Sequence, residues 1–268
     1  MLRLPFIVAL LAYAYVTLAH LLPGLLGDKA LARARAIGAV GAAVHLVTLV
    51  TGALVGGHPP GLPDALMATS FGVAAAYAWI GVGRLRSLGM LLGPLALVLL
   101  GTGLVVPHHT VEALDDTGFS PWLPVHLFLV FAGIAGFALA GAVGAVYLWA
   151  RHQLKQKKFA GMSRLPSLEV LDRIQFRSML FGFVFLTLGI GAGGAWAAAS
   201  LTEPWTVDPK IWTTLLIWVW YGIALQLRLV AGRRGRWTAL FSIIGFCGLV
   251  FSLVGVNYLL SGWHGYGV

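Results

Sequence analysis

Long uninterrupted apolar runs dominate the chain, and short polar segments separate them. A run of roughly 20 apolar residues is long enough to cross a bilayer as a helix. No internal repeat or low-complexity tract divides the chain, so the pattern predicts one all-α transmembrane domain over residues 1–268. The eight predicted transmembrane helices cover residues 5–26, 36–55, 65–83, 88–106, 122–149, 178–200, 210–230 and 238–262.

The polar segment of residues 150–177 is the longest one between two apolar runs. Its second half, PSLEVLDRIQF, has the periodicity of an amphipathic helix. Ser167 is the predicted N-cap, and Glu169 stands in the first turn, where an acidic side chain is favourable. We therefore expect a basic cytoplasmic loop here that ends in a helix.

Basic residues are distributed very unevenly between the predicted loops, with 16 of the 18 in one alternating set. Loops rich in lysine and arginine stay on the cytoplasmic side of a membrane. This bias predicts both termini outside and four cytoplasmic loops. The 16 residues are Lys29, Arg33, Arg35, Arg84, Arg86, Arg151, Lys155, Lys157, Lys158, Arg164, Arg173, Arg177, Arg228, Arg233, Arg234 and Arg236.

Composition agrees with a membrane protein, because 59% of the residues are hydrophobic and only 10% are charged. A soluble domain has about half apolar and about a quarter charged residues. The net charge of +9 follows from the cytoplasmic loops, which can contact anionic lipid, so no nucleic-acid partner is needed to explain it. Cys247 is the only cysteine, which excludes an internal disulfide and a C-x-x-C-H motif for covalent heme.

Two histidines fall at the same predicted depth, at the outer rim of the membrane. His126 begins the fifth predicted helix, and His264 follows the eighth. Histidine is costly in a bilayer and needs a partner, and a hydrogen bond to a backbone carbonyl is the simplest one. Two neutral imidazoles can also ligate one iron from opposite sides.

The predicted external loop between the sixth and seventh helices is rich in tryptophan. It contributes Trp196, Trp205 and Trp212, and Asp208-Pro209 predicts a turn that caps the seventh helix. Tryptophan faces can stack on a planar apolar macrocycle. The alternative is an interfacial aromatic belt, which is a weaker explanation for Trp205 because it stands in the middle of the loop.

Three stretches resemble the cytochrome c assembly protein family, the group of CcsA (ResC), CcmC and HemX-like proteins. They are LPSLEVLDRIQFRSMLFGFVFLTLGIGAGGAWA from Leu165, HLFLVFAGIAGFALAGAVGAVYLWARHQLK from His126, and the ending GVNYLLSGWHGYGV. The resemblance covers about residues 120–268 well and the first hundred residues loosely. Members hold heme between two external histidines and a tryptophan-rich "WWD" loop.

The resemblance implies that His126 and His264 are the axial ligands of a b-type heme (heme b). It places the WWD loop at residues 196–212. The loop residues implied to contact the cofactor are Trp196, Trp205, Asp208, Lys210 and Trp212.

The chain also departs from the family pattern. Leu201 and Val207 stand where CcsA-type members have tryptophan, and Gln226 stands where they have a histidine of a second, intramembrane heme site. These differences move the chain towards the HemX-like branch. His45 and His20 are candidates for a second heme site or a transit path, with helix packing through a hydrogen bond as the alternative.

The leading hypothesis is a multi-pass protein of the cell (cytoplasmic or inner) membrane that serves cytochrome c biogenesis. It would hold heme on the external side and deliver it to apocytochrome c or to a ResB/CcsB-type membrane partner, as a possible subunit of a heme lyase with no catalytic constellation of its own. The alternative is a HemX-like non-catalytic regulator or scaffold that interacts through residues 150–177. A transporter for another substrate is the weaker third hypothesis, because no paired helices are broken at mid-membrane.

Overall fold

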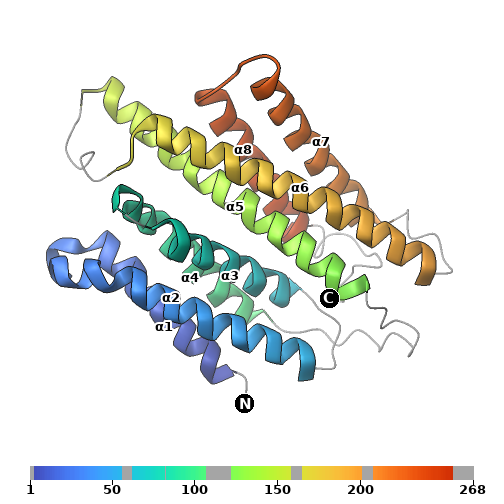
Figure 1. The fold of residues 1–268 in the computed structure, drawn as a ribbon, viewed down its shortest axis with the longest axis horizontal. Helices are drawn as coiled ribbons and strands as arrows, with labels where there is room; N and C mark the ends of the chain where they lie inside the picture. Colours follow the sequence, from blue (N-terminus) through green and yellow to red (C-terminus); the bar gives the residue numbers. More distant parts are fainter. Residues whose placement is uncertain are drawn as a thin grey trace.

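The computed structural model describes residues 3–55, 62–81, 83–106, 122–157, 165–200 and 208–255, which are helical almost throughout (Figure 1). The α-helices are α1 (Arg3–Leu21), α2 (Pro23–Val55), α3 (Leu62–Ile80), α4 (Gly89–Val105), α5 (Trp122–Lys155), α6 (Leu168–Ser200), α7 (Pro209–Leu229) and α8 (Arg236–Val250). A 3₁₀ turn (Gly83–Leu88) precedes α4, and a π-helical turn (Phe251–Gly255) continues α8. Each predicted apolar run therefore corresponds to one helix.

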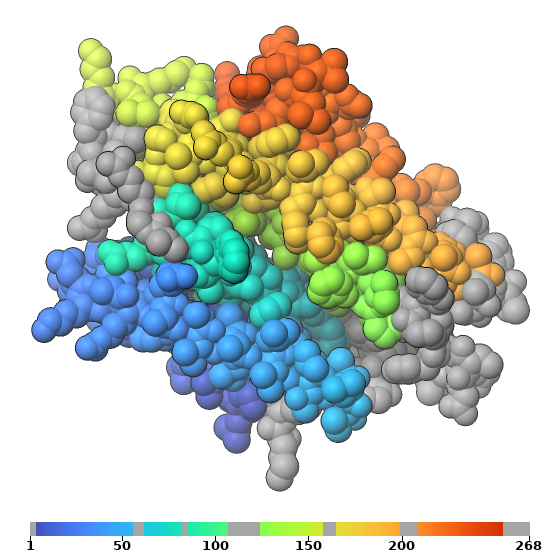
Figure 2. Space-filling view, in the orientation of Figure 1, coloured from blue at the N-terminus to red at the C-terminus, as the bar shows by residue number. Residues whose placement is uncertain are grey.

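The helices form two groups that lie against each other, α1–α4 and α5–α8 (Figures 1 and 2). Helix α5 joins them, because it packs on α6 and α8 and also on α3 and α4. Its neighbouring residues Phe137 and Ala138 belong to different apolar cores, Phe137 to the core of α5–α8 and Ala138 to the core shared with α1–α4. The middle of α5 is thereby held between the two groups of helices.

Six helical segments are long and apolar enough to cross a membrane, in α1, α2, α4, α5, α6 and α8. The chain is thus a multi-pass membrane protein, as predicted. Helices α3 and α7 fall short of the same apolarity because they carry polar residues such as Asp64 in α3 and Gln226 in α7. Eight crossings and the outward orientation of both termini stay predictions.

Helix α2 begins well before the predicted start at residue 36. Pro23 ends α1 because it lacks an N–H donor, and the chain then kinks at Gly27, whose φ of 75° favours glycine. Residues 29–35 (KALARAR) are strong helix formers and continue α2 without a break. The basic residues of this segment therefore lie on a helix and not in a loop.

The amphipathic segment before the sixth predicted span is continuous with that span. Ser167 caps α6, since the Val170 N–H donates to its Oγ at 3.4 Å, and Glu169 lies in the first turn, which confirms both predictions. No proline interrupts residues 168–200, so one helix carries both parts.

Glycines bring α5 and α6 into close contact along their length. A Cβ added at Gly133 would lie 2.9 Å from the Leu186 nitrogen, and one at Gly136 would lie 2.8 Å from the Gly182 nitrogen. Small residues at a membrane helix interface let two backbones approach closely. The approach continues to the end of the pair where His126 lies.

Candidate functional site

His126 lies in the second turn of α5, and its ring faces the backbone of α6. Its Nδ1 donates to the Gly189 carbonyl oxygen at 2.8 Å, since a carbonyl can only accept. A neutral imidazole that is protonated at Nδ1 carries its lone pair on Nε2. Metal-binding histidines are typically fixed in this way by a hydrogen bond from the other ring nitrogen.

Gly193 leaves the space on α6 in which the imidazole of His126 lies, and this space is called the seat. A Cβ added at Gly193 would lie 2.6 Å from both Cε1 and Nδ1 of His126. Gly189, Gly193 and Trp196 have the i, i+4, i+7 spacing of one helix face. Trp196 is therefore one turn beyond the imidazole on the same face, and its buried Nε1 has no hydrogen-bond partner within the described residues.

Asp208 fixes the other end of the predicted loop. Its carboxylate accepts a hydrogen bond from the Lys210 backbone N–H at 2.7 Å, and Pro209 occupies the first helical position. The prediction that Asp208 caps the seventh helix is confirmed. Trp212, in the first turn of α7, is 60% exposed, as a tryptophan at a membrane interface would be. A role of Lys210 and Trp212 in binding a cofactor stays a prediction.

The start of α7 is tied to the end of α8. Thr213 Oγ1 and Ser252 Oγ lie 2.9 Å apart, and Ser252 belongs to the π-helical turn. Such turns occur frequently at functional sites. The chain runs from this turn towards His264, which lies outside the described residues, as does Trp205.

Two further residues of α7 are Trp218 and Gln226. Trp218 stacks on Phe183 with ring centroids 5.5 Å apart and donates to Thr187 Oγ1 at 2.8 Å. It packs on α6 and joins the two helices. Gln226 is exposed on α7.

His20 and His45 lie in the α1–α4 group, away from His126. His20 has a carbonyl oxygen beside each ring nitrogen, that of Val16 2.8 Å from Nδ1 and that of Arg86 2.9 Å from Nε2. It ties α1 to the turn before α4, which agrees with the packing alternative. His45 is fully buried, with Nδ1 3.0 Å from the Tyr13 hydroxyl, and its Nε2 has no partner within the described residues.

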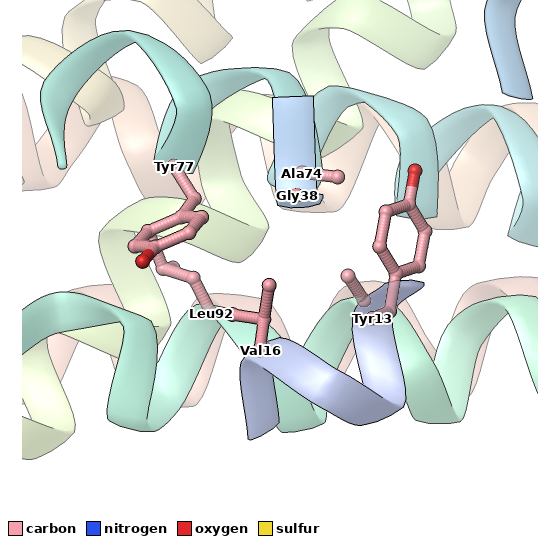
Figure 3. A pocket seen from close by; sticks show the side chains of 8 residues that line it. Tyr13, Val16, Gly38, Ala74, Tyr77 and Leu92 are labelled. Carbon is pink, nitrogen blue, oxygen red and sulfur yellow. The ribbon is translucent and has the colours of Figure 1, made fainter. Parts of the chain in front are cut away.

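A small cavity lies near these two histidines, between the side chains of Tyr13 and Tyr77 (Figure 3). Val16 and Leu92 border it, and its volume is about 10 Å³. That is room for about one water molecule. A porphyrin would fit there only if the helices moved apart, so a second heme site at His45 and His20 stays a prediction.

A buried ion pair joins α6 and α7 at their ends away from His126, and the distribution of basic residues between the loops did not predict it. Arg228 was assigned to a basic loop, yet it is only 9% exposed. Its two terminal nitrogens donate to the Asp172 carboxylate at 2.7 and 2.8 Å, and one of them also donates to Thr238. The signal in the sequence is an arginine inside the apolar run of residues 210–230, because a charged side chain there needs a partner.

The chain is similar to known proteins over much of its length. A family model described as Cytochrome C assembly protein matches residues 7–264. The cytochrome c biogenesis protein CcsA of Prochlorococcus marinus (strain MIT 9312) is 31% identical over 168 residues, 55% of this chain and 54% of the relative. CcsA of Guillardia theta is 27% identical over 203 residues, 69% of this chain and 67% of the relative.

The chain spans about half the length of the Prochlorococcus relative. CcsA of Chlamydomonas reinhardtii is 31% identical over 148 residues, which are 55% of this chain and 41% of that protein. The family model nevertheless covers almost all of the present chain. The chain therefore belongs to the Cytochrome C assembly protein family.

Proposed function

We propose that this protein serves cytochrome c biogenesis by holding a b-type heme on the outer face of the cell membrane. His126 and His264 would ligate the iron, and the loop of residues 196–212 would cover the macrocycle. From this site heme would pass to apocytochrome c or to a ResB/CcsB-type membrane partner. Membership of the family and relatives named cytochrome c biogenesis proteins support this role.

The hydrogen bond from His126 to Gly189 is the observation that carries the proposal. It selects the tautomer that an iron ligand needs, and it holds the ring at the end of α5 beside the predicted loop. The glycine at position 193 leaves room for the ring, because a Cβ there would lie 2.6 Å from two of the ring atoms.

The residues around His126 also fit the shape and polarity of heme. A heme is planar and apolar and bears two carboxylates, and when bound it supplies an iron with two axial positions. Trp196 offers an apolar ring with a buried N–H that is unpaired within the described residues. Buried polar groups are nearly always hydrogen-bonded, so this N–H is suited to donate to a ligand's carboxylate.

In the proposal, the loop of residues 196–212 also orients the heme and excludes water from it. Asp208 holds the start of α7, and the Thr213–Ser252 hydrogen bond holds α7 to the turn that leads to His264. The α7 end of the loop is therefore anchored on a helix, where a binding site is more precise than on a free loop.

Separate His126→Ala and His264→Ala variants test the proposal. Bis-imidazole ligation places two ring nitrogens about 4 Å apart, each about 2.0 Å from the metal. Each variant should therefore yield a five-coordinate heme or none, and added imidazole should partly restore the six-coordinate spectrum. His152→Ala is the matched control, because His152 is exposed near the other end of α5. Six-coordinate low-spin spectra in both variants would contradict the proposed ligands.

A further inference from the structure

We propose that Gly189 and Gly193 are positioning residues that set the orientation of His126 as an iron ligand. The Gly189 carbonyl accepts the Nδ1 proton, and the absence of a side chain at Gly193 gives the imidazole its place. This inference rests on the proposed function, because it assigns the residues that prepare one of the two ligands.

The contact distances distinguish Gly193 from the two other glycines of its turn. A Cβ at Gly193 would lie 2.6 Å from two atoms of the His126 ring and 3.4 Å from Nε2. By contrast, a Cβ added at Gly191 or Gly194 would meet nothing within 4 Å. All three glycines lie in one turn of α6, so helix propensity and membrane depth are nearly the same.

Gly189 acts through its backbone, which a substitution does not remove. A Cβ added there would meet Val130 Cγ2 at 2.8 Å, so its substitution would also push α5 and α6 apart. Gly193 is therefore the position at which the seat is tested without loss of the acceptor. A methyl group at Gly193 would displace the imidazole from the Gly189 carbonyl.

Displacement of the ring has a consequence for metal binding. A hydrogen bond from Nδ1 raises the basicity of a ligating imidazole and fixes its plane, and its loss typically weakens metal affinity by about 10- to 100-fold. Gly193→Ala should therefore weaken heme retention by about that factor and shift the bound heme from low spin towards high spin. Gly194→Ala and Gly191→Ala should keep the wild-type retention and spectrum.

A second experiment also removes the His126 ring, so that the methyl group at position 193 has nothing to clash with. Its result therefore does not depend on whether the protein still folds when Gly193→Ala is combined with an intact His126. In His126→Ala the empty seat should take up free imidazole and regain a six-coordinate spectrum. In His126→Ala/Gly193→Ala the added methyl group occupies that seat without a clash. The imidazole concentration for half-restoration should then rise at least about tenfold, the lower end of the typical effect. His126→Ala/Gly194→Ala should behave like His126→Ala.

The outcomes distinguish the seat from the proposed function. Suppose that the wild type binds heme and His126→Ala loses low-spin character, while Gly193→Ala and Gly194→Ala show the same heme retention and spectrum. In that case the proposed role of Gly193 is wrong and the assignment of His126 as a ligand stands. Equal imidazole titrations of the two double variants would also overturn the seat. If wild-type protein binds no heme, or if His126→Ala leaves its spectrum unchanged, the proposed function itself fails.

Discussion

For a histidine at a membrane rim, the partner of one ring nitrogen decides what the other nitrogen can do. The Gly189 carbonyl accepts from Nδ1 of His126, which places the lone pair of the neutral ring on Nε2, the atom that we propose as the iron ligand. His20 has a protein carbonyl beside each ring nitrogen. The two histidines are equally apparent in the sequence, and only the structure shows which backbone groups each ring contacts.

Among the loop tryptophans, Trp205 is the one that an interfacial aromatic belt explains least well. Trp205→Ala should weaken heme retention because a stacking face is lost, while the protein still accumulates in the membrane. Heme content per protein after washing in detergent measures this. Trp79→Ala is a suitable control, because Trp79 is 85% exposed at the end of α3, outside the α5–α8 group. Unchanged retention in Trp205→Ala would make Trp205 a belt residue.

Residues that act through local chemistry could be predicted from the sequence, and residues that act through a tertiary contact could not. Asp208 before Pro209 is a local capping signal, and the structure confirms it. Gly193 appears in the sequence only as one glycine in GIGAGG, because its role depends on a ring that lies 67 residues away in the chain, in α5. Arg228 was misassigned for the same reason, since its partner Asp172 comes from α6.

Among the helices, α6 connects the two ends of the membrane domain. It begins with the capped amphipathic turn at Ser167 and ends with the face that carries Gly193 and Trp196. Apolar periodicity predicted its membrane part but gave no reason to join it to the amphipathic part.

The ion pair between α6 and α7 should contribute strongly to stability. Asp172→Ala would leave Arg228 buried without its counter-charge, which typically costs about 3–5 kcal/mol. Glu169→Ala removes an exposed i, i+4 pair with Arg173 from the same helix and should cost about 0.5 kcal/mol or less. Free energies of unfolding measured in mixed detergent micelles compare the two. Equal losses would show that the buried pair adds no stability beyond an exposed one.

The sequence predicts the direction in which the helices cross the membrane. The arrangement of the helices alone does not test this prediction. The 16 basic residues of the alternating loops predict that both termini are outside. A reporter that works only in the cytoplasm should therefore give no signal when fused to the C-terminus. The same reporter inserted within residues 150–177 should be active. A strong C-terminal signal would reverse the topology and move His126 and His264 to the inner face.

The central claim is that the intact protein holds heme between two histidines, and the visible spectrum of the detergent-purified wild type tests it most directly. The account predicts a six-coordinate, low-spin b-type spectrum with bis-histidine character. The heme should be extractable with acidified organic solvent, because the chain has no C-x-x-C-H motif to bind it covalently. A protein that stays colourless after heme supplementation would contradict the account and favour a regulator or scaffold without heme.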